Sequence, residues 1–459
     1  MSVRVGLLVG MLFASFQIQA AAVVEGEMIV RLNKGVSAQQ FELSVLDADG
    51  AGSVEIVEPL IPDLDLYLVR VSPGANTRAA FSALGTNRMV KYAQPNHVIT
   101  RRESNVPNDA MFKQQWGLAN PAGNGADIKA LDAWKLGTGG LDRLNNEIVV
   151  AVVDGGIDVK HQDLADNVWY NKGEVAGNGK DDDGNGYIDD INGWNAFNST
   201  GNLPPDTHAT HVAGIVGATG NNGKQVTGVN WKVKIMSIAG ASGNTATVAK
   251  AYGYVAAQKK LYLESKGAKG AFVVSTNSSF GVDYGDCSSA TYKAWNDMYD
   301  YMGSLGILSA AATANLNIDV DVKGDVPTGC ASPYMFAVTN TTSTDAKNSS
   351  AGYGKKTIDI GAPGTAILAT LPNNQTGNLT GTSMATPHIA GAIGLLHSLA
   401  SKEFATMSVQ KPGQAALMLK DAMIKSVDVI PSLKDVTVSG GRLNLAKAAA
   451  SISRFKAKK

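Results

Sequence analysis

Three short motifs carry side chains that could act together in nucleophilic catalysis. The apolar run IVVAVVD ends in Asp154, HATHVAG begins with His208, and GTSMATPHIAGAIGLL contains Ser383. A serine hydroxyl becomes a good nucleophile only when a base takes its proton, and that base needs a carboxylate to orient it. The chain order Asp154, His208, Ser383 is one of the orders in which such triads occur.

The start of the serine motif also offers groups that could stabilise a negative charge. Glycine and small polar residues precede a helical pattern there, so Ser383 is expected at or near a helix N-terminus. A helix N-terminus presents backbone N–H groups and the positive end of its dipole to a developing oxyanion. Asn315 ends the run GILSAAATAN and could supply a second donor through its side-chain amide. We therefore predict an oxyanion site made by Asn315 and the N–H of Ser383.

A metal site is the alternative for the histidine motif, because His208 and His211 lie three residues apart. Zinc-binding helices of the HExxH type carry an acidic residue in the motif, whereas Ala209 and Thr210 fill the gap here. The motif therefore favours a general base at His208 and predicts that His211 packs on its helix. A structural role is also predicted for the remaining histidines, which are His97, His161, His388 and His397.

The candidate groups follow strand-like runs that alternate with helical patterns. Continuous β-branched runs of this kind indicate a parallel sheet covered by helices on both faces, so we predict a three-layer αβα fold. Ligands and reacting groups gather at the carboxyl ends of such strands, where Asp154 and Asn315 fall. Strands are predicted at 148–154, 233–239, 271–277, 306–315, 335–340 and 357–363, and helices at 245–265 and 288–304.

The N-terminal part of the chain has a different organisation. Residues 1–22 place Arg4 before an apolar run and then alanines, which is the order of a secretory signal peptide; a buried N-terminal helix is the alternative. EMIVRL, LDLYLVRV and VKYAQPNHVIT are typical of strands and TRAAFSALG of a helix, which predicts a small α+β domain over 23–104. The polar segment RRESNVPND indicates a linker or processing site, and the larger domain is expected over 105–459.

Composition narrows the functions further. The chain has 459 residues and a formal net charge of +0, whereas a nucleic-acid-binding protein normally carries a basic excess. After residue 22, no stretch reaches about 18 apolar residues without a charge or a breaker, so we expect no membrane anchor. The two cysteines, Cys287 and Cys330, could form one disulfide in an oxidising compartment or remain two buried thiols.

Taken together, the motifs resemble those of the subtilisin-like serine proteases, the subtilases of peptidase family S8. GTSMATPHIAG matches the serine motif of that family almost letter for letter, and AVVDGGID and HATHVAG resemble its aspartate and histidine motifs. The resemblance covers roughly residues 105–450. It implies a subtilisin-like fold with Asp154, His208 and Ser383 as the triad and Asn315 as the oxyanion donor.

The resemblance also has implications for substrate binding. STNSSFG resembles the strand that pairs with the substrate backbone. Ala314 stands where the family usually has a glycine that lines the P1 pocket, which receives the side chain preceding the scissile bond. Its added methyl group is expected to disfavour large aromatic P1 residues. The residues implied in substrate binding are Ser278, Ser279, Phe280, Gly281 and Ala314.

The motifs depart from the usual residues of the family at a few positions. Gly155 replaces threonine or serine, Ala209 replaces glycine, and Thr313 with Ala314 replaces an alanine–glycine pair. Each change exchanges one small residue for another, and the four chemical groups remain. Alanine is tolerated at position 209 if the backbone φ is negative, as it is in a helix. We therefore expect an active protein rather than a catalytically dead relative.

The acidic loop NGKDDDGNGYIDDINGW is a candidate calcium site. Alternate oxygen ligands on a glycine-rich turn suit calcium, and similar insertions in the subtilases often bind it. The loop is not an EF-hand, because Asn192 stands where that motif has its bidentate glutamate. A solvated acidic loop without metal is the alternative. The predicted ligands are Asp181, Asp183, Asn185 and Asp189.

These observations predict a secreted serine endopeptidase that is made as a self-processing zymogen. Residues 23–104 resemble the propeptide that serves such proteases as inhibitor and folding aid. The substrates would be polypeptides, and we expect a monomer that is extracellular, or periplasmic in a host with an outer membrane. A non-catalytic peptide-binding protein and a calcium-dependent surface or adhesion module are the rival functions, and the four intact chemical groups favour the enzyme.

Overall fold

A computed structural model describes residues 23–45, 54–72, 77–98, 106–123 and 125–456 of the chain. The predicted signal peptide at 1–22 lies outside the described residues. The chain divides into two compact units, Met1–Glu103 and Ser104–Lys459.

The described residues of the smaller unit form a four-stranded antiparallel sheet, in the order β2-β3-β1-β4, and two helices. Met28, Val30 and Leu32 alternate along β1 and are buried with Phe41 and Leu84 of the helices, as the period of two in a strand requires. The predicted strands and helix are confirmed, and β2 and α1 are additional. The elements are β1 (Val23–Leu32), α1 (Ala38–Val45), β2 (Val54–Ile61), β3 (Leu66–Val71), α2 (Thr77–Thr86) and β4 (Val90–His97).

The larger unit is built around a nine-stranded sheet in the order β16-β17-β13-β12-β10-β8-β5-β7-β6. All neighbouring strands are parallel except β16 and β17, so the predicted, mainly parallel sheet is confirmed. Six strands overlap the predicted runs: β5 (Val149–Asp154), β7 (Lys234–Ala239), β8 (Val273–Ser278), β10 (Leu308–Ala312), β12 (Met335–Thr341) and β13 (Ile360–Pro363). The short strands β6 (Gly193–Asn195), β16 (Asp428–Val429) and β17 (Gly441–Arg442) complete the sheet.

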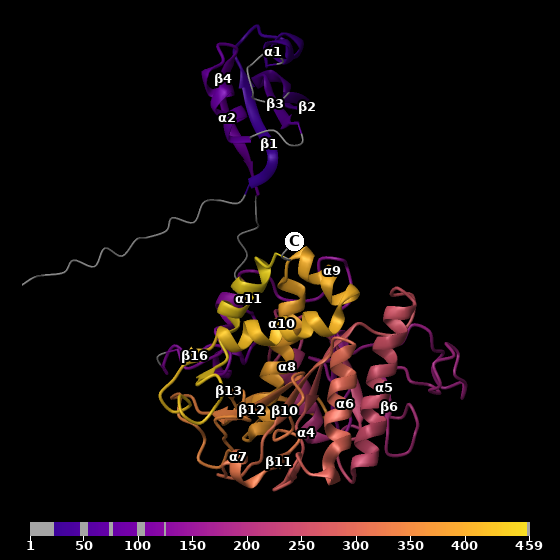
Figure 1. The fold of residues 1–459 in the computed structure, drawn as a ribbon. Helices are drawn as coiled ribbons and strands as arrows, with labels where there is room; N and C mark the ends of the chain where they lie inside the picture. The colour runs from indigo at the N-terminus through magenta and orange to yellow at the C-terminus, as the bar shows by residue number, and fades with distance from the viewer. Residues whose placement is uncertain (1–22, 46–53, 73–76, 99–105, 124, 457–459) are drawn as a thin grey trace, which may run out of the picture. The chain divides into compact units, whose positions relative to one another are not determined.

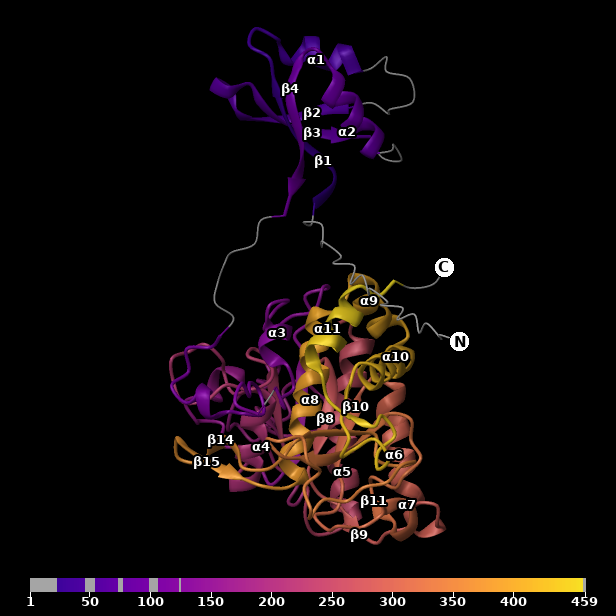
Figure 2. The ribbon, with the colours of Figure 1, turned by 90° about the vertical axis from the view of Figure 1, so that its left-hand side faces the viewer.

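Helices cover both faces of this sheet, and the alternation along β5 shows the two layers. Val150 and Val152 pack in one core with α4 and α8, whereas Val149, Ala151 and Val153 pack in a second core with α5 and α6 (Figures 1 and 2). The three-layer prediction is therefore confirmed. The helices are α3 (Ala130–Trp134), α4 (Thr207–Gly217), α5 (Thr245–Glu264), α6 (Lys293–Ser304), α7 (Val320–Lys323), α8 (Thr382–Leu399), α9 (Lys402–Gln410), α10 (Pro412–Lys425) and α11 (Leu445–Ser453).

Two short antiparallel ribbons lie outside the large sheet. One pairs β9 (Val282–Asp283) with β11 (Asp325–Val326), and the other pairs β14 (Ile367–Leu371) with β15 (Gln375–Leu379). A disulfide between Cys287 and Cys330 joins the segment after β9 to the segment after β11. Of the two alternatives for the cysteines, the structure therefore contains the disulfide.

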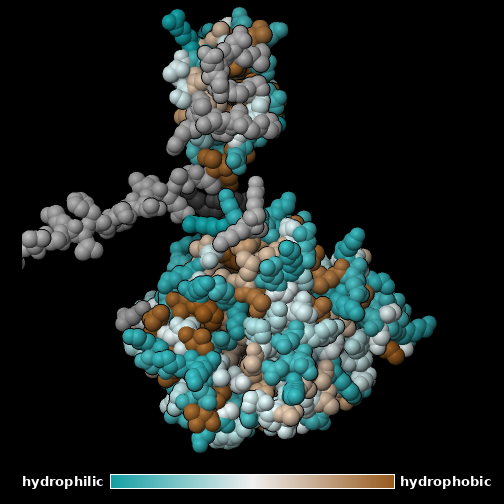
Figure 3. Space-filling view, viewed as in Figure 1, coloured by the Kyte–Doolittle hydropathy of each residue, from teal (hydrophilic) through white to brown (hydrophobic). Residues whose placement is uncertain are grey.

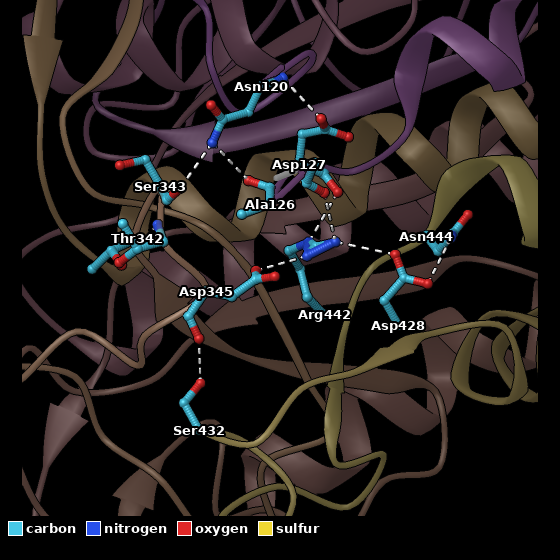
Figure 4. Close-up of polar contacts among 12 residues, drawn as sticks. Asn120, Ala126, Asp127, Thr342, Ser343, Asp345, Asp428, Ser432, Arg442 and Asn444 are labelled. Carbon is cyan, nitrogen blue, oxygen red and sulfur yellow. Dashed lines mark hydrogen bonds and ion pairs between the residues drawn. The ribbon is translucent and has the colours of Figure 1, made fainter. Parts of the chain in front are cut away.

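Arg442 of β17 is a buried charge that ties the end of the chain to earlier segments. Its Nη1 lies 2.7 Å from Asp345 Oδ1, its Nη2 lies 3.1 Å from Asp428 Oδ2, and its Nε donates to the carbonyl oxygen of Asp127 over 2.9 Å (Figure 4). A guanidinium group that is only 2% exposed needs such partners, because an unpaired buried charge is strongly destabilising. These bonds hold the β16–β17 edge of the sheet against the loop that precedes α3.

The surface of the larger unit is of mixed character. On the face that Figure 3 draws, hydrophobic residues occur in scattered groups among hydrophilic ones. Each helix in the described part of the chain is too short or too polar to cross a bilayer.

Candidate active site

Asp154 and His208 meet at the carboxyl edge of the sheet. Asp154 is the last residue of β5 and is buried, and His208 is the second residue of α4. His208 Nδ1 lies 2.9 Å from Asp154 Oδ2 and 3.1 Å from Oδ1, and Oδ1 also accepts the N–H of Gly155 over 2.8 Å. The carboxylate thereby orients the imidazole with Nδ1 as the donor, which leaves Nε2 free to accept a proton.

The pKa of His208 results from opposing effects. Burial lowers it, but the hydrogen bond to Asp154 and the charges of Asp154 and Asp206 together raise the pKa above its ordinary value. Asp206 is the N-cap of α4, where its Oδ1 accepts the N–H of Ala209 over 2.8 Å. Sequence reasoning missed Asp206, although an aspartate directly before a helical pattern is a recognised capping signal.

Ser383 and Asn315 lie together at the N-terminus of α8. Ser383 is the second residue of that helix, and its Oγ donates to the carbonyl oxygen of Ser279 over 3.3 Å. Asn315 follows β10, and its Oδ1 accepts the N–H of Thr382 over 2.9 Å and the Thr382 hydroxyl over 3.1 Å. A β-carbon on Gly381 would lie 3.5 Å from Asn315 Nδ2 and 3.7 Å from the nitrogen of Ser383. Two N–H donors therefore border the space beside Gly381.

The unusual residues in the motifs have identifiable neighbours. A β-carbon on Gly155 would come within 2.7 Å of the Asp206 side chain, so glycine leaves room for that cap. Ala209 is fully buried inside α4, in the helical conformation where alanine is favourable. Thr313 donates its hydroxyl to Asp325 Oδ2 over 3.3 Å. These departures are accommodated without displacing Asp154 from His208.

The second histidine of the HATHVAG motif is turned away from the first. His211 is fully buried, and its Nε2 lies 2.9 Å from the carbonyl oxygen of Ile367 and 3.0 Å from that of Gly377. Burial lowers the pKa of His211 to about 4, partly opposed by these two bonds, so the ring is neutral. The ring therefore links α4 to the β14–β15 ribbon, in agreement with the predicted structural role.

The residues expected to bind substrate border a small cavity of about 80 Å³ beside Ser383. Its lining includes Ser279, Phe280, Gly281, Ala314 and Asn315, whereas Ser278 is fully buried in β8 and bonded to the Tyr252 hydroxyl. The lining also includes two carboxylates that sequence reasoning missed, Asp283 and Asp325. No periodicity or motif marks these two, because the β9–β11 pairing alone brings them together.

In the acidic loop, two of the four predicted ligands, Asp181 and Asp189, already accept backbone N–H groups. Asp181 accepts the N–H groups of Gly184, Asn185 and Gly186, and Asp189 accepts those of Gly177, Asn178 and Gly179. Both side chains are therefore used to shape the loop.

In and just before this loop, the carboxylates of Glu174, Asp183 and Asp190 have oxygens within 4.8 Å of one another and could hold a metal ion; Asp154, Asp206 and His208 form a second group of that kind at the candidate active site. Asn185 stays near them by donating to Asp183 over 3.2 Å and to Asp190 over 3.1 Å. Burial raises the pKa of Asp190 to about 7, opposed by hydrogen bonds from Tyr254, Asn171 and Asn185 and reinforced by the charge of Asp183. Carboxylate and amide oxygens are hard donors that suit a divalent cation such as calcium. Glu174 also accepts the N–H groups of Asp182, Asp183 and Asp189, so Glu174, Asp183 and Asp190 form a second candidate set, which shares Asp183 with the predicted one.

Family models match most of the chain. The model of the subtilase family (Peptidase_S8) matches residues 145–444, and the model of the fervidolysin N-terminal prodomain matches residues 12–96.

Individual relatives support the same comparison. The thermophilic serine proteinase of Bacillus sp. (strain AK1) is 28% identical over 389 residues, which are 83% of this chain and 80% of that protein. The extracellular protease of Xanthomonas campestris pv. campestris is 30% identical over 322 residues, and subtilisin-like protease 1 of Plasmodium falciparum is 29% identical over 370 residues. The alignment with the Xanthomonas protease covers 66% of this chain and 52% of that protein, and the alignment with the Plasmodium protease covers 74% of this chain and 47% of that protein. The chain therefore spans about half the length of each of these two relatives.

A solved structure shares the fold. It is a protease from Pseudoalteromonas arctica, superposed with a TM-score of 0.55 at 22% identity over 76% of this chain and 100% of that one. At this level of identity the likeness concerns the fold alone.

Proposed function

The chain belongs to the subtilase family, and on that premise we propose that it is a secreted serine endopeptidase made as a self-processing zymogen. The observation that carries this proposal is the bond of 2.9 Å between His208 Nδ1 and Asp154 at the sheet edge where Ser383 and Asn315 also lie. A buried carboxylate that orients an imidazole, with a serine at a helix N-terminus on the same edge of the sheet, is an arrangement suited to acyl transfer.

In the proposed reaction, Ser383 Oγ attacks the peptide carbonyl carbon while His208 Nε2 takes its proton. Because Ser383 Oγ donates to the Ser279 carbonyl in the structure, this step requires rotation of the serine side chain toward the imidazole. Asn315 Nδ2 and the Ser383 N–H donate to the oxyanion, and the protonated His208 then delivers the proton to the leaving amine. Asp154 stays ionised and stabilises the imidazolium.

A fluorophosphonate probe tests this assignment against the two rival functions. Such a probe phosphonylates only an activated serine, so we expect covalent labelling of the wild-type protein and none of Ser383→Ala. The measurement is the mass of the labelled peptide, which should contain Ser383. A folded protein that takes up no label would favour a peptide-binding or adhesion protein instead.

We extend the proposal to the N-terminal part of the chain. Residues 1–22 would direct export, and residues 23–104 would act as inhibitor and folding aid of the catalytic unit. The match of residues 12–96 to a prodomain model supports the second role. Relatives named extracellular protease and cell wall-associated protease support export.

We also propose that Glu174, Asp183 and Asp190 hold a calcium ion that stabilises the fold. Calcium supplies charge neutralisation to three carboxylates that lie within 4.8 Å of one another. The group anchors its loop to α5, because Asp190 accepts the hydroxyl of Tyr254 over 2.6 Å. A role in stability rather than in chemistry follows from this position.

Calcium should therefore raise the melting temperature, and a chelator should lower it. An ion that binds only the folded state at a hundred times its Kd stabilises it by about 2.7 kcal/mol. Asp183→Asn should remove most of the calcium-dependent shift, whereas Asp435→Asn, on the exposed surface, should keep it. Differential scanning calorimetry with calcium and with chelator measures the shift, and identical wild-type melting in both would contradict the site.

The pH dependence should report the environment of His208. Its pKa is raised, so kcat/KM should fall as the pH drops through a value above the ordinary histidine pKa, because the protonated ring cannot accept the serine proton. Asp206→Asn keeps a side-chain oxygen for capping and removes one of the charges that raise this pKa. The acidic limb of the profile should therefore move to lower pH in that variant. An unmoved limb would show that Asp206 does not act on His208.

A further inference from the structure

The cavity beside Ser383 is acidic. Its charged lining residues are Asp283 and Asp325, and no lysine, arginine or histidine is among the described residues that line it. Asp325 pairs with Asp283 across the β9–β11 ribbon, and the Cys287–Cys330 disulfide joins the segments that follow the two strands. The negative charge is thus built into a covalently tied ribbon.

Asp325 has one saturated carboxylate oxygen and one that lacks a partner. The residue is only 1% exposed. Its Oδ2 accepts the N–H of Ala314 over 3.1 Å, the Thr313 hydroxyl over 3.3 Å and the Thr328 hydroxyl. Among the residues that the structure describes, none donates to Oδ1. Oδ1 is not one of the fully buried polar atoms that lack a partner, so it reaches the open space of the cavity, where it is free to accept a hydrogen bond from a ligand.

We propose that this cavity is a P1 pocket that selects a cationic side chain, lysine or arginine, and that Asp325 Oδ1 is the atom that binds the cation. The proposal rests on the proposed function, because it assumes that Ser383 attacks the bond next to the selected side chain. Ala314 favours the same class of substrate. Its methyl group in the cavity lining takes up room that an aromatic ring would need, whereas the unbranched stem of a lysine or arginine side chain is slender.

The charge of Asp325 suits this role at alkaline pH. Burial raises its pKa to about 6, hydrogen bonds from Thr328, Ala314 and Thr313 oppose that rise, and the charge of Asp283 adds to it. The carboxylate is therefore ionised at about pH 8, where a lysine or arginine side chain remains charged. Asp283 is exposed at the rim and contributes a second, better solvated charge.

The test compares matched peptides that differ only at P1, with lysine, arginine, norleucine, leucine or phenylalanine, assayed at about pH 8 on the mature enzyme. Norleucine reproduces the lysine stem without its charge. The expected result for wild type is a kcat/KM for lysine or arginine roughly 10- to 100-fold above that for norleucine, the range of a hydrogen bond to a charged group. Asp325→Asn should bring this ratio close to one, and Asp283→Asn should lower it less.

Two further variants serve as controls. Asp286 lies outside the cavity lining, so Asp286→Asn should keep the wild-type ratio of kcat/KM for lysine over norleucine. Ala314→Gly should raise kcat/KM for phenylalanine while the preference for lysine over norleucine persists. If Asp325→Asn does not fold, the wild-type ratio alone still decides the question.

The outcomes separate this proposal from the proposed function. Equal cleavage after norleucine and lysine by wild type, or an unchanged ratio in folded Asp325→Asn, would overturn the P1 assignment while leaving the endopeptidase intact. Failure to cleave any of the peptides, together with absence of fluorophosphonate labelling, would overturn the endopeptidase itself.

Discussion

Ser383→Ala should accumulate as an unprocessed precursor and should show almost no peptide hydrolysis. In subtilisin, loss of the triad serine lowers kcat about 2 × 10⁶-fold, and binding and the oxyanion donors alone leave only about 10³–10⁴-fold acceleration over water. If the same serine cuts the chain within about residues 100–106, the variant should keep its N-terminal part attached. Electrophoresis, intact mass and N-terminal sequencing of the purified protein measure this.

A second serine on the same helix provides the matched control. Ser398 lies on α8 and donates to the carbonyl oxygen of Leu395 over 2.7 Å, so Ser398→Ala should be processed and active. A trace of wild-type enzyme added to the Ser383→Ala precursor should cut it in trans, which shows that the site is accessible. Normal processing of purified Ser383→Ala with no other protease present would refute self-processing.

Asn315→Ala should lower kcat by about 10²–10³ with little change in KM, the loss found for the oxyanion asparagine of subtilisin. The physical reason lies in the orientation of the amide. Asn315 Oδ1 is occupied by the N–H and hydroxyl of Thr382, which directs Nδ2 to the remaining side. The amide donor is already oriented before the reaction and stabilises a charge that appears only in the transition state. Its loss should therefore lower kcat and leave substrate binding nearly unchanged.

A second asparagine near Asn315 provides the control for the expected loss of kcat. Asn317 is exposed, and its Oδ1 accepts from Lys347 Nζ over 3.1 Å, so Asn317→Ala should retain a kcat close to that of wild type. Steady-state kinetics on one peptide substrate measures both variants, and melting curves check that both are folded. An Asn315→Ala enzyme with wild-type kcat would mean that other donors hold the oxyanion.

The pattern of apolar residues along the chain was sufficient to predict the central strands of the fold. The run that ends in Asp154 is buried on both faces and therefore continuously apolar, which marks a central parallel strand without any knowledge of its neighbours. Pattern failed for β2, whose charged residues and Pro59 do not resemble a strand. As an edge strand it needs neither two buried faces nor every ladder N–H, so its sequence is free to vary.

The chemical groups of the candidate triad were legible in the sequence because each lies in a short motif whose local structure places it. Asp154 ends a strand, and His208 and Ser383 each stand second in a helix, so carboxyl-edge topology brings all three to one side of the sheet. The acidic loop shows the limit of such reasoning. Five aspartates close in sequence reveal an excess of oxygens, but they do not reveal which oxygens backbone N–H groups will occupy.

The sequence by itself thus determined the layered α/β architecture, the small N-terminal α+β unit and the four groups proposed for catalysis, because strand and helix periodicity and motif spacing are local properties. Only the tertiary structure decided that Glu174, Asp183 and Asp190 converge, that Cys287 meets Cys330, and that Asp325 lines the cavity beside Ser383. Those contacts join segments far apart in the chain, and no local preference encodes them: they arise when strand pairing and core packing choose which distant surfaces meet.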